Sequence, residues 1–223
     1  YNYLVEQPAT QYAYSWRINF NKNNEDNTED VNYNKAIANT AFRQSIYYAL
    51  DLTTYYQRTN SIHPMSCEND AYTMKGLIYT TDGTDYTQLV RDELGLPAYN
   101  GETPVRLNAD KAAALKAQAI EELTALGVEF PVKLAYYING SSQTALDSAT
   151  VLKNSLENSL GSDYVTLNIK TYVSSFSKEV RDASLHGLYI SGWGADYGDP
   201  MNYLSQELMG YDGAWYADRH RNI

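Results

Sequence analysis

The alternation of strand and helix patterns in the second half of the chain constrains its fold more than any other feature. Five segments follow one another there, with strand, helix, strand, helix and strand patterns over residues 130–137, 143–159, 165–172, 174–183 and 188–191. Such alternation is typical of layered structures in which helices cover a sheet. We therefore expect an α/β fold, built on a layered mixed β-sheet flanked by helices.

The first half of the chain supplies one further strand and several helices. Apolar and polar side chains alternate over residues 12–20, which is the period of a half-buried strand. Helix patterns cover residues 41–50, 53–58, 85–94 and 108–126. Thr40 is the expected cap of the helix over 41–50, Asp82 or Asp85 that of the helix over 85–94, and Asn108 that of the helix over 108–126. Residues 21–34 and 61–84 are expected to be loops, since neither has a sustained apolar period.

The segment after the last strand carries the strongest functional signal. It reads Gly-Trp-Gly-Ala-Asp-Tyr-Gly-Asp-Pro over residues 192–200, and in open α/β sheets ligands collect where strand ends feed loops. Its glycine spacing departs from the dinucleotide fingerprint, and Asp196 and Asp199 would repel a pyrophosphate. A carboxylate beside an indole ring instead suits an ammonium group. Asp196 offers a charge-assisted hydrogen bond, and Trp193 offers a cation-π surface.

Three other interpretations of this segment stay open on the sequence alone. In a purely structural one, Trp193 closes a core beside a glycine turn while Asp196 caps local backbone N–H groups. A glycosidase or carbohydrate-binding surface protein is the second, with Asp196 and Asp199 as paired acids and aromatic rings that stack on sugars. A surface adhesin that binds macromolecules is the third.

Composition narrows the range of partners. A formal charge of -10 and a pI near 4.7 argue against nucleic acid, which requires clustered lysines and arginines. The three histidines lack metal-ligand spacing, so we expect no metal, no cofactor and no catalytic residue. Cys67 is the only cysteine, which excludes an internal disulfide. No apolar run approaches the roughly 18 residues that would span a membrane. Most of the 22 tyrosines are expected to be structural.

Four blocks of sequence together resemble one protein family. Residues 192–200 are similar to a Gly-Trp-x-Ala-Asp-Tyr-x-Asp/Glu-Pro segment. The other blocks come in the family's order: Trp-Arg-Ile-Asn-Phe-Asn at residues 16–21, Ala-Phe-Arg-Gln-Ser-Ile-Tyr-Tyr-Ala-Leu-Asp at 41–51, and a helix that starts Asn-Ala-Asp-Lys-Ala at 108 and ends Leu-Gly-Val at 126–128. The family is that of the oligopeptide-binding proteins of bacterial ABC importers, the family 5 extracellular solute-binding proteins.

The resemblance implies one lobe of a type II periplasmic-binding-protein-like clamshell. Family members are normally at least twice this length, so residues 1–223 are interpreted as a single peptide-binding lobe excised at its hinge. Such a protein is no enzyme. It binds oligopeptides in the cleft between two lobes and delivers them to the permease subunits of an ABC transporter. The expected location is the extracellular face of the bacterial cell membrane, through a lipid anchor absent from this chain, or the periplasm.

The resemblance also assigns roles to residues by motif position. It implies that Asp196 binds the free α-amino group of a peptide and that Trp193 lies beside it. Some family members carry a cysteine where this chain has Gly194. Independently of the resemblance, backbone groups from Gly192 to Ala195 are expected to pair with an extended peptide by strand addition. Gly194, Ala195 and Tyr197 are therefore candidate ligand-binding residues as well.

Three residues outside the segment are further candidates for ligand binding. Tyr137 and Asn139 lie where a strand ends and a helix begins, at a turn that borders the ligand in the resembled family, although an Asn-Gly turn also forms for local reasons. Arg181 lies where some family members place a ligand-contacting arginine. Its alternative role is to offset a helix dipole while exposed to solvent.

Overall fold

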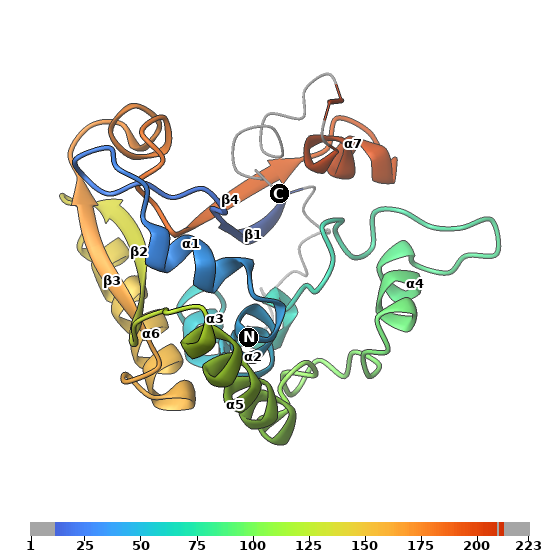
Figure 1. The fold of residues 1–223 in the computed structure, drawn as a ribbon. Helices are drawn as coiled ribbons and strands as arrows, with labels where there is room; N and C mark the ends of the chain where they lie inside the picture. The colour runs from blue at the N-terminus through green and yellow to red at the C-terminus, as the bar shows by residue number, and fades with distance from the viewer. Residues whose placement is uncertain (1–11, 209, 212–223) are drawn as a thin grey trace. The chain divides into compact units, whose positions relative to one another are not determined.

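The computed structural model describes residues 12–208, 210 and 211 (Figure 1). His220, one of the three histidines, lies outside these residues. The two ends of the chain, where we expected hinge cuts, also lie outside them. The elements are, in chain order, β1 (Tyr12–Ile18), α1 (Val31–Ala38), α2 (Thr40–Ala49), α3 (Thr53–Thr59), a 3-10 turn (Pro64–Cys67), α4 (Tyr86–Glu93), α5 (Ala109–Ala125), β2 (Val132–Asn139), α6 (Gln143–Leu160), β3 (Val165–Tyr172), a π-helical turn (Ser177–Arg181), β4 (Leu188–Gly194), α7 (Pro200–Leu204) and a 3-10 turn (Ser205–Glu207).

The four strands form one sheet in the order β1-β4-β2-β3. β2 runs parallel to β3 along its whole length and parallel to β4. β1 runs antiparallel to β4. The contacts show this direction, since the ring of Tyr14 lies over Gly192 and the ring of Tyr12 lies over Gly194. The sheet is therefore mixed, which confirms the class expected from the alternation of strands and helices.

The chain forms two compact units. Of the described residues, the smaller unit contains 12–16, 69–99 and 190–211, and the larger contains 17–68 and 100–189. β1 and β4 each contribute residues to both units. That residues 1–223 act as a single lobe stays a prediction.

In the larger unit, α6 packs along β2 and β3, and α2 and α5 lie side by side (Figure 1). The register of β2 on β3 places Val132 opposite Val165, and both side chains are fully buried. Leu152 and Leu156 of α6 are buried four residues apart, so both lie on one face of the helix. Full burial of each such leucine contributes about 1.5–3 kcal/mol to folding.

The smaller unit has a core of its own. Ala13, Ile78, Ala195 and Tyr203 are buried together, and Met74, Leu77 and Tyr86 pack against them. Ala195 directly precedes the acidic part of the 192–200 segment, and Tyr203 lies in the helix that follows it. The loop between Ala195 and Tyr203 is therefore anchored in this core at both ends.

The helices confirm most of the sequence-based boundaries. Asn108 caps α5 and Asp85 caps α4, and in each case the side-chain oxygen accepts a backbone N–H of the first turn. The cap predicted for the helix over residues 41–50 was wrong. Asn39 accepts the N–H of Phe42 at 2.8 Å, so Thr40 becomes the first helical residue.

Two segments differ from the sequence-based expectation. Residues 31–34, expected as loop, begin α1, because Asp30 caps the helix and the Tyr33 side chain is buried despite the acidic surroundings. Residues 174–183, expected as a helix, contain only the π-helical turn. The carboxylate of Glu179 accepts the N–H groups of residues 173, 174 and 175, so these residues are held at the start of the turn and lie outside it. The strand expected over residues 130–137 is β2, which begins and ends two residues later.

Candidate ligand-binding site

The last strand extends further than the sequence suggested. β4 continues through Gly192, Trp193 and Gly194, which we expected in a loop. The glycines explain the extension, because a Cβ atom on Gly192 would lie 2.5 Å from the Tyr14 ring and one on Gly194 would lie 2.9 Å from the Tyr12 ring. Glycine at both positions lets aromatic rings of β1 lie across the strand.

One backbone edge of this part of β4 has no strand paired with it among the described residues. Pairing of β4 with β2 is confined to Leu188, opposite Tyr136. On its other side, β4 is paired with β1. Among the described residues, no strand therefore pairs with the second edge of β4 over residues 190–194. An edge of this kind presents N–H and C=O groups to which an extended chain can add.

Trp193 has a fixed ring orientation and a partly exposed face. Its indole N–H donates a 2.8 Å hydrogen bond to the main-chain carbonyl oxygen of Asn202 in α7. The residue is 37% exposed, whereas Ala195, two positions on, is only 4% exposed and belongs to the core. Trp193 therefore borders the core without being enclosed by it, and part of its ring stays accessible for contact.

The two acids of the segment have different roles. One carboxylate oxygen of Asp199 accepts the N–H of Met201 at 2.8 Å and so caps α7, which begins at Pro200. The backbone N–H of Asp196 donates to the side-chain oxygen of Asn202 at 3.0 Å. The capping role that the sequence left open for Asp196 is thus performed by Asp199.

The carboxylate of Asp196 is available for an external partner. The residue is exposed, and its carboxylate has neither a hydrogen bond nor an ion pair with any residue of 12–208, 210 or 211. Chemically, it can accept charge-assisted hydrogen bonds from a cation, and the Trp193 face can add a cation-π contact. Tyr197 is 63% exposed, whereas the side chain of Ala195 is buried and its backbone is hydrogen-bonded to the Tyr203 phenol.

The remaining sequence-predicted residues belong to the larger unit, and their ligand roles stay predictions. The Asn139 side-chain oxygen accepts both the N–H and the hydroxyl of Ser141, so the turn is stabilised locally, as the alternative interpretation required. Tyr137 is half-buried with the Lys170 ammonium 5.8 Å from its ring centroid, and burial raises the pKa of its phenol. Arg181 pairs with its neighbour Asp182 at 3.3 Å.

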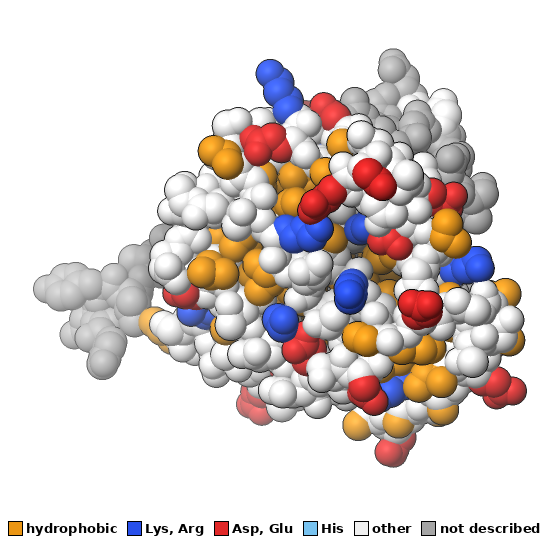
Figure 2. Space-filling view, turned by 60° about the vertical axis from the view of Figure 1, so that its left-hand side comes forward, with side chains coloured by type: hydrophobic (Ala, Val, Ile, Leu, Met, Phe, Trp, Pro, Cys, Tyr) orange, Lys and Arg blue, Asp and Glu red, His pale blue; other side chains and the backbone are white. Residues whose placement is uncertain are grey.

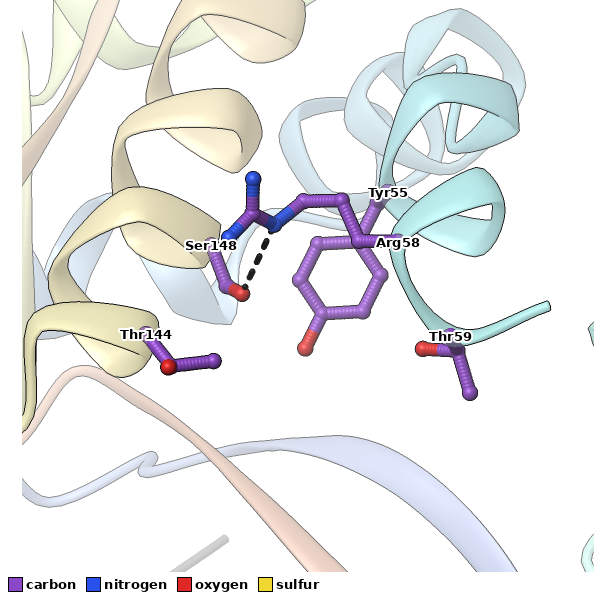
Figure 3. Close-up of a pocket in the computed structure, with 5 residues that line it drawn as sticks. All are labelled: Tyr55, Arg58, Thr59, Thr144 and Ser148. Atoms are coloured by element: carbon purple, nitrogen blue, oxygen red, sulfur yellow. Dashed lines mark hydrogen bonds between the residues drawn. The ribbon is translucent and has the colours of Figure 1, made fainter. Parts of the chain in front are cut away.

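A pocket between α3 and α6 was not anticipated from the sequence. Tyr55, Arg58 and Thr59 of α3 and Thr144 and Ser148 of α6 line about 360 Å³ of space (Figure 3). The Arg58 guanidinium points across it, with Nε donating to the Ser148 hydroxyl at 3.3 Å and Nη2 lying 3.4 Å from Asp147. Its charge is therefore balanced within the two helices. The lining residues are far apart in the chain, so no local motif marks them.

The structure also bears on the other interpretations. Paired-acid hydrolysis requires two available carboxylates, and the Asp199 carboxylate is engaged at the start of α7. Within the described part of the chain, no three His, Cys, Asp or Glu side chains are grouped as metal ligands. On the face drawn in Figure 2, acidic and basic side chains are interspersed rather than gathered by sign. None of the described helices is long and apolar enough to cross a bilayer.

Comparison with known sequences identifies relatives along nearly the whole chain. Residues 2–214 match the model described as bacterial extracellular solute-binding proteins, family 5 Middle. Oligopeptide-binding protein AliB of Streptococcus pneumoniae serotype 4 is 27% identical over 221 residues, which cover 89% of this chain and 33% of AliB. Oligopeptide-binding protein AmiA of the same organism is 31% identical over 196 residues, which cover 79% of this chain and 29% of AmiA. The chain spans about a third of the length of these relatives.

Solved structures share the fold at lower sequence identity. The substrate-binding domain of an oligopeptide ABC transporter from Bacillus anthracis aligns with a TM-score of 0.64 and 20% identity, covering 93% of this chain and 35% of that one. OppA of Listeria monocytogenes, solved with a bound peptide, aligns with a TM-score of 0.60 and 17% identity, covering 93% and 37%. These alignments confirm the expected fold, that of a lobe of peptide-binding proteins of this class. Because the family model matches nearly all of its length, the chain belongs to the family 5 bacterial extracellular solute-binding proteins.

Proposed function

We propose that this chain is the peptide-holding part of a substrate-binding protein that serves a bacterial ABC importer. Peptide binding is supported by the relatives of the chain, AliB and AmiA, which are oligopeptide-binding proteins. The complete protein would deliver peptides to membrane permease subunits from the extracellular face of the membrane or from the periplasm. Its action would be binding and release without chemical change to the ligand.

The observation that carries this proposal is the exposed Asp196 carboxylate, which has no partner among the described residues. An exposed carboxylate without an internal partner keeps both of its oxygens available to accept hydrogen bonds from a ligand. The α-ammonium group of a peptide is a suitable partner, because it brings three N–H donors and a full positive charge. Trp193 would flank that group with the accessible part of its ring.

The edge of β4 that has no paired strand in the described part of the chain supports an extended ligand in particular. A peptide that adds as a strand beside residues 190–194 forms main-chain hydrogen bonds with β4, and these bonds do not depend on the identity of the peptide's side chains. Such binding suits ligands of varied sequence. With the amino terminus anchored at Asp196, the register of the added strand would be fixed by charge rather than by any side chain.

Two matched variants of the full-length protein test the proposal. Asp196→Asn and Asp199→Asn remove the same charge from the same loop, and asparagine preserves the helix cap at residue 199. We expect Asp196→Asn to weaken binding of free peptides about 10- to 100-fold, the equivalent of one charge-assisted hydrogen bond. N-acetylated peptides should bind both variants and wild type with equal affinity. Unchanged affinity of Asp196→Asn for free peptides, or an equal loss in Asp199→Asn, would contradict the proposal.

A further inference from the structure

Asn202 contacts Trp193 and Asp196, the two residues that are proposed to bind the ligand's amino terminus. Its main-chain carbonyl oxygen accepts the indole N–H of Trp193 at 2.8 Å, and its side-chain oxygen accepts the backbone N–H of Asp196 at 3.0 Å. Asn202, a residue of α7, is therefore hydrogen-bonded to Trp193 through its backbone and to Asp196 through its side chain.

Asn202 is itself held in place on both sides. Its own N–H donates to the carbonyl oxygen of Asp199 at 3.0 Å, in the first turn of α7. The next residue, Tyr203, is 2% exposed and packs in the core with Ala195. The oxygen atoms of Asn202 thus have a fixed position relative to the end of β4.

The bond to Asp196 has a specific consequence for its carboxylate. In loops of this kind an aspartate often uses its carboxylate to accept nearby backbone N–H groups, as Asp199 does with Met201. Asn202 accepts the backbone N–H of Asp196 itself and thereby fixes the peptide unit that carries the acid. The carboxylate is left outside the local network on a backbone that is held in place, which lowers the cost of ordering that backbone when a ligand arrives.

We infer that Asn202 is a positioning residue for amine recognition, whose side-chain oxygen orients Asp196 for the ligand's α-ammonium group. This inference rests on the proposed function of Asp196. It assigns to Asn202 a share of selectivity between free and blocked amino termini, without direct contact to the ligand.

The test uses three variants of the full-length protein, titrated with one peptide in free and N-acetylated forms. Asn202→Ala removes the side-chain oxygen and keeps the carbonyl that binds Trp193. Loss of one neutral hydrogen bond should weaken free-peptide binding about fivefold and leave the acetylated peptide unchanged. Asn202→Asp keeps an oxygen acceptor and should restore most of the preference for the free peptide. If the alanine variant does not fold, Asn202→Ser, whose shorter side chain cannot span the same distance, replaces it.

The results separate the inference from the function on which it rests. An equal loss for both peptide forms in Asn202→Ala would mean a general structural role and overturn the inference. Unchanged selectivity in Asn202→Ala beside lost selectivity in Asp196→Asn would also overturn it, while leaving the proposed function intact. Unchanged selectivity in Asp196→Asn would remove both.

Discussion

The indole N–H of Trp193 donates a hydrogen bond to the main-chain carbonyl oxygen of Asn202 at 2.8 Å. The bond fixes the edge of the ring without using its face, and the residue remains 37% exposed. Trp193 can therefore serve as a rigid surface for a cation, with little rotamer freedom left to lose on binding.

This arrangement predicts graded effects of substitutions at Trp193. Trp193→Leu removes the aromatic face and should weaken binding of free peptides about two- to fivefold, the range of an exposed cation-π contact of about 0.5–1 kcal/mol. Trp193→Phe keeps a ring and should show a smaller loss. Isothermal titration of the full-length protein measures both. Equal affinities for wild type and the leucine variant would show that the indole face does not meet the ligand.

A buried ion pair in the smaller unit should matter for stability. Asp70 lies 2.6 Å from Arg91, with side chains 4% and 5% exposed, and Arg91 also donates to the carbonyl oxygen of Pro97 at 2.7 Å. Asp70→Asn leaves a buried guanidinium without its counter-charge, so the free energy of unfolding should fall by about 3–5 kcal/mol. Denaturant titration monitored by circular dichroism measures the change.

The matched control for that prediction is the exposed pair of Arg58 and Asp147, which lie 3.4 Å apart with side chains 36% and 46% exposed. Asp147→Asn should change the free energy of unfolding by less than about 1 kcal/mol, because solvent screens both charges. A comparable cost at both sites would contradict the importance assigned to burial.

Glu179 predicts a dependence of stability on acid pH. Hydrogen bonds from the backbone N–H groups of Val173, Ser174 and Ser175, and from the Ser174 hydroxyl, lower the pKa of its carboxyl from 4.5 to about 2. A carboxyl whose pKa is lower in the folded state stabilises that state above its unfolded-state pKa and loses this effect as pH falls through the folded-state value.

Wild type should therefore melt at a higher temperature than Glu179→Gln at pH 6, and the difference should shrink between about pH 4.5 and pH 2. Differential scanning calorimetry over that range measures it. A difference that stays constant or widens on acidification would show that the charge of Glu179 does not hold the loop.

The sequence was sufficient where local chemistry decided the structure. Asn108 and Gly127 bound a long amphipathic helix, and α5 occupies the residues between them, with Gly127 at a φ of 73°. Strand β3 coincides with its predicted range, because apolar and polar side chains alternate along it with the period of a strand. The membership of the family likewise followed from short motifs in the expected order.

Prediction failed where a tertiary contact outweighed the local pattern. The extension of β4 to Gly194 depends on Tyr12 and Tyr14, which lie about 180 residues earlier in the chain. In residues 174–183, by contrast, a local contact of the Glu179 carboxylate with N–H groups four to six residues earlier holds the start of a single π-helical turn, where a longer helix was expected. The apolar periodicity of the sequence predicts neither effect. The role proposed for Asn202 could not be predicted from the sequence either, because it depends on two hydrogen bonds that this residue forms with Trp193 and Asp196.

The distance from the ligand's terminal nitrogen to the Asp196 carboxylate, in a structure of the full-length protein with a bound free peptide, tests the central claim most directly. We expect about 2.7–2.9 Å, the range of a charge-assisted N–H···O bond. An Asp196 carboxylate paired instead with a lysine or arginine of the protein, or a ligand nitrogen held by another residue, would contradict the account.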